Sequence, residues 1–189
     1  MTVLITGATG FVGSRLAHAL LTGRGQRLVA VGRGSLATAQ SRIVEAVSAH
    51  GRLDESARRR LRCVGGDITQ PWLGMPPAVY AQLAREVSGV WHCAGDIALA
   101  GDRERLFGVN VQGTANVLDF AELTGHACRV VHVSTIVVAG RRADGSVLED
   151  DLCQSPRTVE TFLCSQLLGE AGPVVVFVVD RALPMAHAV

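Results

Sequence analysis

A glycine-rich turn near the N-terminus has the residue spacing of an anion-binding site. Residues 6–13 read TGATGFVG and place glycine at positions 7, 10 and 13. The apolar run Val3–Thr6 precedes the turn and the helical pattern Phe11–Leu21 follows it. Glycine allows a tight turn and a close approach to a pyrophosphate, and the amides that begin a helix face the anion. Strand, turn and helix together predict dinucleotide binding.

The residue that would select the dinucleotide follows the second expected strand, Arg27–Val31. Sites that bind NAD place an acidic side chain there, about 20 residues after the turn, to hold the ribose hydroxyls. This chain has Arg33 instead. A guanidinium pairs with a 2′-phosphate that a carboxylate would repel, so we expect NADP(H) to be favoured over NAD(H). The alternative is that Arg33 is a solvated residue at the end of a strand.

The composition excludes several kinds of chemistry. The chain has eighteen arginines, no lysine and one tyrosine, Tyr80, so a Schiff-base lysine, a phosphate-loop lysine and a Tyr-x-x-x-Lys pair are excluded. A net charge of +1 and an aromatic content of 4% argue against nucleic acid as a partner. The five cysteines show no Cys-x-x-Cys spacing, and we expect reduced, buried thiols and no metal site. They are Cys63, Cys93, Cys128, Cys153 and Cys164.

Short apolar runs alternate with helical patterns along the chain, which is typical of β-α-β units. The expected fold is α/β, a Rossmann-type doubly wound parallel sheet in three α/β/α layers. No linker or repeat divides the sequence, so we expect one domain over residues 1–189. The sequence shows no signal peptide or membrane span, and we expect a cytoplasmic protein. The expected strands are Val3–Thr6, Arg27–Val31, Leu61–Val64, Gly89–Cys93, Arg129–Ser134 and Val174–Val179.

Two long helices are expected to cover the sheet, with apolar residues at helical spacing. In Phe11–Leu21 these residues are Val12, Leu16, Ala19 and Leu20, and in Leu106–Leu123 they are Leu106, Val109, Val117, Leu118 and Ala121. The cluster Arg58–Arg60 is interpreted as a solvated helical face rather than an anion site. The polar segment Gly140–Pro156 is expected to be a loop at the carboxyl end of the fifth strand, where active-site loops lie.

Five blocks of the sequence resemble extended short-chain dehydrogenases/reductases and follow one another in that family's order. They are TGATGFVG at 6–13, GDITQPWLG at 66–74, VWHCAG at 90–95, NVQGT at 110–114 and VHVSTIVVAG at 131–140. The set is similar to the thioester-reductase branch, which includes reductase domains of carboxylic acid reductases, nonribosomal peptide synthetases and fatty acyl-CoA reductases. The resemblance implies an NADPH-dependent reductase of acyl thioesters that yields an aldehyde or an alcohol.

The resemblance also implies a role for each matching residue. The pyrophosphate would be cradled by Gly7, Thr9, Gly10, Phe11, Val12 and Gly13. Arg33 would meet the 2′-phosphate, and Asp67 with Ile68 would border the adenine. The backbone of Cys93, Ala94 and Gly95 would lie along the cofactor, and Asn110 would brace the strand ends near the nicotinamide. Thr135 matches the Ser/Thr that hydrogen-bonds the reacting carbonyl. Its alternative is a strand-end threonine satisfied by the backbone.

The family's catalytic pair is replaced in this chain. The family carries a Tyr-x-x-Ser-Lys run where this sequence has Phe162 and Gln166. Phenylalanine has no proton to give, and glutamine brings no charge that would lower a neighbour's pKa. Loss of a positioned acid typically costs about 10²- to 10⁴-fold in rate. We expect Tyr80 to lie too far away to substitute, and His132 to be a satisfied core histidine. The acids of the polar loop, expected to be solvated, are Asp144, Glu149, Asp150 and Asp151.

The C-terminal segment raises a second departure from the family. The family continues beyond its sixth strand to build the substrate pocket, and we expect that substrate-binding part to be missing from this chain. The valine-rich strand Val174–Val179 would then expose an apolar edge and favour self-association. Three functions stay open. They are reduction of a small-molecule or carrier-bound acyl thioester, NADP(H) binding without catalysis by a binding protein or a degenerate fragment of such a reductase, and an epimerase or dehydratase of a nucleotide sugar, which would lack the 66–74 block.

Overall fold

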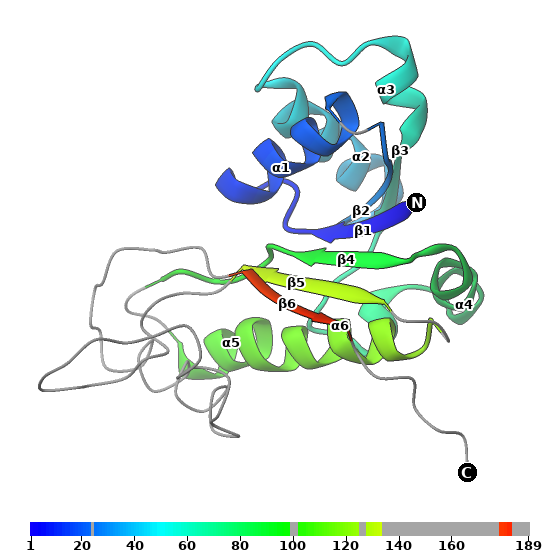
Figure 1. The fold of residues 1–189 in the computed structure, drawn as a ribbon. Helices are drawn as coiled ribbons and strands as arrows, with labels where there is room; N and C mark the ends of the chain where they lie inside the picture. The colour runs from blue at the N-terminus through cyan, green and yellow to red at the C-terminus, as the bar shows by residue number, and fades with distance from the viewer. Residues whose placement is uncertain (24, 99–101, 125–127, 134–177, 183–189) are drawn as a thin grey trace, which may run out of the picture.

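Strands and helices alternate along the chain as the sequence predicts (Figure 1). The computed structural model describes residues 1–23, 25–98, 102–124, 128–133 and 178–182. The elements before the middle of the chain are β1 (Thr2–Thr6), α1 (Phe11–Thr22), β2 (Arg27–Gly32), α2 (Leu36–Ser48), α3 (Glu55–Arg60), β3 (Leu61–Gly65), η1 (Pro71–Gly74) and α4 (Pro77–Glu86). They are followed by β4 (Gly89–His92), α5 (Arg103–Phe107), η2 (Gly108–Gln112), α6 (Gly113–Glu122), β5 (Arg129–Val133) and β6 (Val178–Ala182).

The strands form one sheet in the order β3-β2-β1-β4-β5-β6. The first five are parallel, which confirms the predicted Rossmann-type arrangement, and the chain changes direction across the sheet between β1 and β4. The sixth strand differs from the expected parallel pairing. β6 runs antiparallel to β5, with Val178 opposite Val133, and such an edge strand is common on parallel sheets. Residues 174–177 of the expected strand lie outside the described residues.

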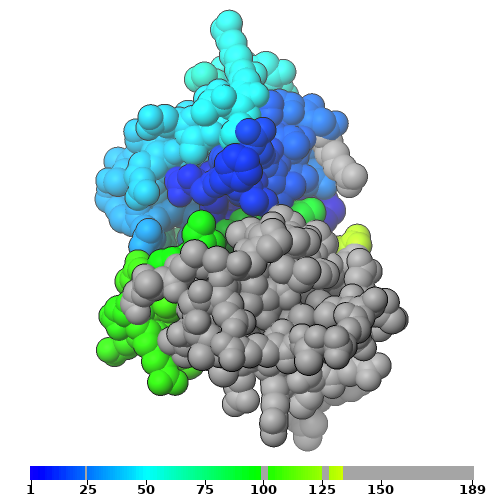
Figure 2. Space-filling view, turned by 90° about the vertical axis from the view of Figure 1, so that its left-hand side faces the viewer, coloured from blue at the N-terminus to red at the C-terminus, as the bar shows by residue number. Residues whose placement is uncertain are grey.

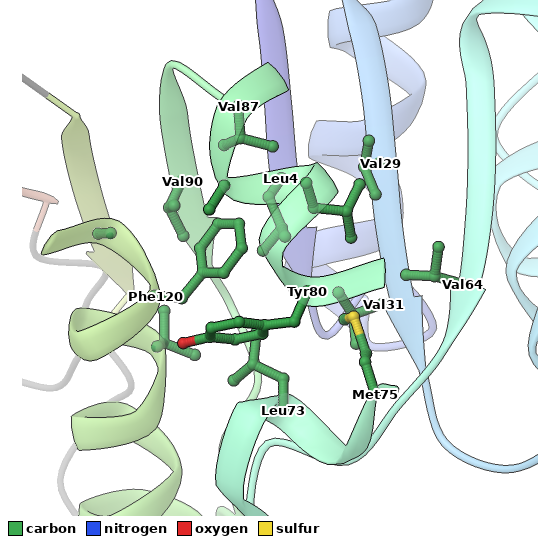
Figure 3. Close-up of a cluster of buried hydrophobic side chains, with 14 of the residues drawn as sticks. Leu4, Val29, Val31, Val64, Leu73, Met75, Tyr80, Val87, Val90 and Phe120 are labelled. Carbon is green, nitrogen blue, oxygen red and sulfur yellow. The ribbon is translucent and has the colours of Figure 1, made fainter. Parts of the chain in front are cut away.

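Two hydrophobic cores lie on the two faces of the sheet and account for its three layers. Alternate residues of β1 serve opposite faces, so Leu4 joins one core while Val3 and Ile5 join the other. The first core packs α4 and α6 against the sheet, and Figure 3 shows Tyr80 of α4 beside Phe120 of α6. Their ring centroids lie 5.2 Å apart in an edge-to-face arrangement. Tyr80 is therefore a core residue, and the expectation that it lies too far away to replace the catalytic tyrosine stays a prediction.

Two helical faces differ from the predicted ones. In α1 the buried residues are Gly13, Ser14, Ala17, Leu20 and Leu21, whereas Ala19 is exposed. Glycine and serine are buried there because the helix begins against the glycine turn. A prediction based only on large apolar residues therefore assigns the wrong face of α1 to the core.

The segment predicted as one helix over 106–123 contains three pieces, because η2 is a π-helical turn between α5 and α6. The wider turn rotates the face that follows it. As a result Leu118 and Leu123 are exposed, while Phe120, absent from the predicted face, is fully buried.

The stretch between residues 35 and 60 forms two capped helices. The Thr38 amide donates to Ser35 Oγ at the start of α2, and the Ala57 amide donates to Asp54 Oδ1 at the start of α3. The arginines of α3 have different partners. Arg59 pairs with Glu55 on an exposed face, as predicted, whereas Arg60 donates to the Leu21 carbonyl at 2.7 Å. Among the described residues no helix is both long and apolar enough to cross a bilayer.

Candidate dinucleotide site at the switch point

A pocket of about 440 Å³ opens at the carboxyl ends of β1, β2, β3 and β4, where parallel α/β sheets bind ligands. Figure 2 looks onto this side of the molecule, where the N-terminal segments, in blue and cyan, lie next to the residues around α5, in green. The lining consists of Thr6, Gly7, Thr9, Gly10, Val31, Gly32, Arg33, Ala39, Arg42, Gly66, Asp67, Ile68, Thr69, Cys93, Ala94, Gly95, Asp96, Ile97, Arg105 and Val109. Three of the five sequence blocks, at 6–13, 66–74 and 90–95, therefore contribute residues to one cavity.

The glycine turn is held by contacts between main-chain segments. Gly7 has φ of 72°, and a Cβ there would lie 2.5 Å from the Ala94 nitrogen. A Cβ on Gly13 would collide with the Gly7 carbonyl. Gly10 is different, because a Cβ there would meet only the Gly7 oxygen, at 3.3 Å. Two glycines thus permit close packing of the turn, and the third leaves the start of α1 open toward the pocket.

The structure brings most of the predicted cofactor residues together. Nine of them line the pocket: Gly7, Thr9, Gly10, Arg33, Asp67, Ile68, Cys93, Ala94 and Gly95. Phe11, Val12 and Gly13 do not line it. Phe11 is 77% exposed and carries the Arg15 guanidinium 4.9 Å from its ring centroid. Thr135, Phe162 and Gln166 lie outside the described residues, as does the polar loop at 140–156.

Several lining residues escaped the sequence reasoning, and Arg42 is the most informative of them. It lies on α2, three residues after Ala39, so both side chains reach the pocket from one helix face. Within the described residues neither Arg33 nor Arg42 forms an ion pair. The signal was available, because Ser35 caps α2 and thereby fixes which helical positions face the end of β2.

The loop after β3 is held by side chains that bind its backbone. Asp67 Oδ1 accepts hydrogen bonds from the amide and the hydroxyl of Thr69, at 2.9 and 2.8 Å. Asn116 Nδ2 donates to the Ile68 carbonyl at 2.7 Å. The turn that closes the loop has Trp72 and Leu73 in the left-handed region, with φ of 55° and 56°. Rigid hydrogen bonding therefore maintains a strained turn next to the pocket.

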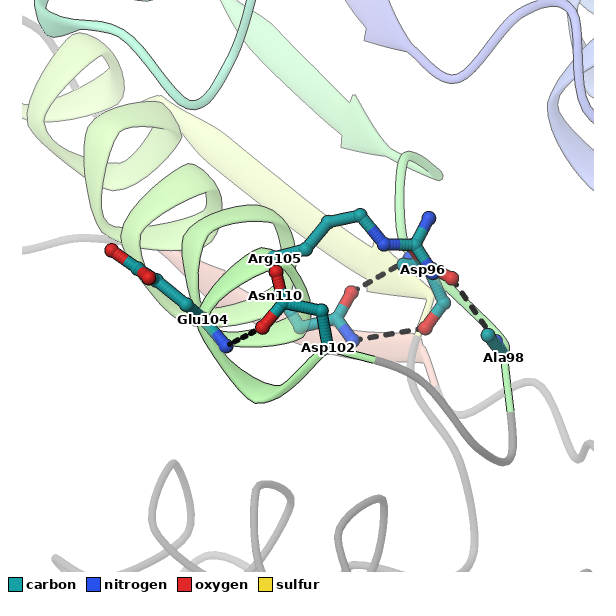
Figure 4. A network of polar contacts seen from close by, with 6 residues as sticks. All are labelled: Asp96, Ala98, Asp102, Glu104, Arg105 and Asn110. Carbon is teal, nitrogen blue, oxygen red and sulfur yellow. Dashed lines mark hydrogen bonds and ion pairs between the residues drawn. The ribbon is translucent and has the colours of Figure 1, made fainter.

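Asn110 braces the loop after β4 although it does not line the pocket itself. Its Oδ1 accepts from the Asp96 amide at 2.8 Å, and its Nδ2 donates to the Asp96 carbonyl at 2.9 Å (Figure 4). The Asp96 carboxylate in turn pairs with Arg105 at 2.8 Å and accepts from the Ala98 amide. Asn110 belongs to the π-helical turn η2, a structure that is frequent at functional sites.

Burial shifts the pKa values of two histidines behind the pocket. The rings of His92 and His132 stack with centroids 4.8 Å apart. Burial, and to a smaller extent the charge of His132, lowers the pKa of His92 to about 3, and burial lowers the pKa of His132 to about 4. The buried Nδ1 of His132 has no hydrogen-bond partner among the described residues, and the satisfied state expected for this core histidine stays a prediction.

The three described cysteines are free thiols, as predicted. Burial raises the pKa of Cys93 to about 12 and that of Cys63 to about 11. A thiol that stays protonated is a poor nucleophile, so Cys93 contributes surface to the pocket rather than reactivity. No group of three metal-ligating side chains occurs within the described part of the chain.

Comparison with known proteins identifies relatives that share this arrangement. An isonitrile lipopeptide synthase of Streptomyces coeruleorubidus is 33% identical over 139 residues, which is 72% of this chain and 9% of the synthase. A carboxylic acid reductase of Segniliparus rugosus is 32% identical over 147 residues, 73% of this chain and 12% of the enzyme. The chain thus spans a small part of the curated relatives that it matches.

A solved structure shows the same fold. The terminal R domain from the myxalamid PKS-NRPS biosynthetic pathway superposes with a TM-score of 0.70 at 26% identity, covering 88% of this chain and 44% of that domain. Residues 5–165 match the NAD-binding family described as male sterility protein. The glycine turn, the pocket at the switch point and these matches agree, and the chain belongs to the male sterility protein family of NAD-binding domains.

Proposed function

We propose that the pocket binds NADP(H) in preference to NAD(H). The observation that carries this proposal is the presence of two arginines, Arg33 and Arg42, at the β2–α2 side of a pocket whose other side is the glycine turn. Within the described residues no carboxylate pairs with either guanidinium, so both are available to a phosphate.

The pocket residues fit the parts of such a dinucleotide. Gly10 leaves the start of α1 open, so its backbone amides can hold a pyrophosphate. Arg33 and Arg42 would hold the 2′-phosphate, and the loop with Asp67 and Ile68 would border the adenine. Asn110, through Asp96, fixes the backbone of the segment that would lie along the cofactor. The chemistry that a nicotinamide dinucleotide supplies when bound is hydride transfer.

Cofactor preference is measurable by titration of the chain with NADPH and with NADH. We expect Arg33→Ser and Arg42→Ser each to raise the Kd for NADPH by about tenfold or more, because a charge-assisted hydrogen bond is lost. The Kd for NADH should change little. Arg59→Ser is the matched control, because Arg59 pairs with Glu55 on an exposed face of α3. Equal affinity for the two nucleotides in the unmodified chain would contradict the preference.

We further propose that the chain is the cofactor-binding part of a reductase of acyl thioesters, either small-molecule or carrier-bound. Its family and its similarity to a carboxylic acid reductase and to an R domain support this substrate class. The test is oxidation of NADPH in the presence of an acyl-CoA or a carrier-bound thioester. Absence of turnover above the buffer rate would refute present reductase activity.

A second candidate function is nucleotide binding without turnover, and Phe162 and Gln166 favour it. The family resemblance aligns these residues with the tyrosine that donates the proton and the lysine that assists it, and neither side chain can do that chemistry. The double change Phe162→Tyr with Gln166→Lys separates the two candidates. Gain of NADPH oxidation in this variant, with an unchanged Kd for NADPH, would show that only the catalytic pair was missing.

A further inference from the structure

A chain of hydrogen bonds passes through His92 behind the pocket and connects three segments that form it. The Ala94 amide donates to Thr6 Oγ1 at 3.3 Å, and Thr6 Oγ1 lies 2.7 Å from His92 Nδ1. On the other side of the ring, His92 Nε2 lies 3.1 Å from Thr114 Oγ1. The Thr114 hydroxyl then donates to the Asn110 carbonyl at 2.7 Å.

The direction of every hydrogen bond in this chain follows from its last member. A hydroxyl has a single hydrogen, and Thr114 gives its hydrogen to the Asn110 carbonyl, so Thr114 must accept from His92 Nε2. Nε2 therefore carries the proton, and Nδ1 accepts a hydrogen bond from the Thr6 hydroxyl. Thr6 Oγ1 remains an acceptor for the Ala94 amide. One neutral tautomer satisfies all four bonds.

The segments connected in this way are the ones that a bound dinucleotide has to span. Thr6 ends β1 and begins the glycine turn, and Ala94 lies in the loop after β4. Asn110 lies in η2 and clamps the backbone of Asp96 in that same loop. His92 itself is only 1% exposed and does not line the pocket. Its effect on a ligand must therefore pass through the segments that it joins.

We propose that His92, as the neutral Nε2–H tautomer, is a positioning residue that sets the spacing between the glycine turn, the loop after β4 and Asn110, and thereby the affinity for the nucleotide. The effect on affinity rests on the proposed NADP(H) binding, whereas the hydrogen-bond directions do not. Burial also keeps the ring neutral near pH 7, because it lowers the pKa of His92.

The tautomer is tested directly by NMR of the unmodified chain labelled with ¹⁵N in its histidine rings. We expect the His92 signals of an imidazole protonated at Nε2 and unprotonated at Nδ1 at pH 7. A variant with His92→Gln assigns the signals. A ring protonated at Nδ1 would overturn the hydrogen-bond directions, whatever the chain binds.

The positioning role is tested with two variants of Thr114, a residue that does not line the pocket. Thr114→Val keeps the shape and removes the hydroxyl, whereas Thr114→Ser keeps the hydroxyl. We expect Thr114→Val to raise the Kd for NADPH by about five- to tenfold, the usual effect of one lost hydrogen bond with its partners left unpaired, and Thr114→Ser to restore the original value.

The affinity must be measured well below the melting temperature, so that all variants are folded. A purely structural role for the hydrogen bonds predicts a lower melting temperature in Thr114→Val with an unchanged Kd, and that result would refute the positioning role. An unmodified chain that binds neither nucleotide would refute the proposed function and the effect on affinity together. The histidine signals would still report the tautomer, so the two failures are distinguishable.

Discussion

The stacked pair His92 and His132 predicts that the fold loses stability in mild acid. Both rings are neutral in the folded chain, with pKa values of about 3 and about 4 against an ordinary value of 6.5. Below pH 6.5 these two histidines therefore bind protons in the unfolded chain but stay neutral in the folded chain. The free energy of unfolding is at its full value above pH 6.5, falls as the pH drops below it, and levels off only near the folded pKa values.

The size of this loss at pH 5 depends little on the folded pKa values, because both lie below 5. Between pH 7 and pH 5 each histidine changes the free energy of unfolding by about 2 kcal/mol, taking 6.5 for the unfolded ring and RT of about 0.59 kcal/mol. If the two rings act independently, the pair accounts for about 4 kcal/mol, a large share of the stability of an ordinary domain.

Urea unfolding at pH 7 and pH 5, followed by circular dichroism, measures this loss. His92→Gln should recover about 2 kcal/mol of the difference between the two pH values, because glutamine does not titrate, even though the variant is less stable at both. His18→Gln, which removes a histidine outside the pair, is the control variant. The reasoning is refuted if His92→Gln and the unmodified chain lose the same free energy between pH 7 and pH 5.

Three further predictions concern the glycine turn, the turn at Trp72 and the C-terminal segment. Gly7→Ala should cost at least about 3 kcal/mol in thermal or urea unfolding, because its Cβ would lie 2.5 Å from the Ala94 nitrogen. Gly25→Ala, also at positive φ but with nothing within 4 Å, should cost only about 1 kcal/mol, and equal losses would contradict the role of crowding. Trp72→Gly should be more stable than Trp72→Ala by up to about 1 kcal/mol, because both variants lose the indole and only glycine relieves the strain of a φ of 55°, and equal stability of the two variants in urea would disprove the strain. The valine-rich segment 174–179 leads us to expect self-association, and a single monomeric species in sedimentation at micromolar concentration would oppose it.

The sequence predicted the parts of the site that depend on main-chain geometry. Glycine spacing between a strand and a helix located the turn, because Gly7 packs against the backbone of the loop after β4 and Gly13 packs against the backbone of Gly7. Strand positions followed from apolar runs that are buried on both faces. These features depend on residues that are close together in the sequence, so the sequence alone shows their patterns.

The features that the sequence did not predict depend on helix rotation and on long-range contacts. Arg42 reaches the pocket because the cap at Ser35 sets the phase of α2, and Phe120 is buried because η2 turns the face of α6. The hydrogen bond of Asn116 to the Ile68 carbonyl joins residues 48 positions apart, and no periodic pattern in the sequence predicts such a contact. Antiparallel pairing of β6 likewise depends on how the chain returns to the sheet.

The glycine turn has a consequence for how such a protein can change over time. At Gly7 and Gly13 backbone packs directly against backbone, so the contact requires only that these two residues have no side chain. Substitutions in distant segments, including those that remove a proton donor or a lysine, leave that fit intact. An intact turn is therefore evidence about the packing at this end of the sheet and carries no information about catalysis.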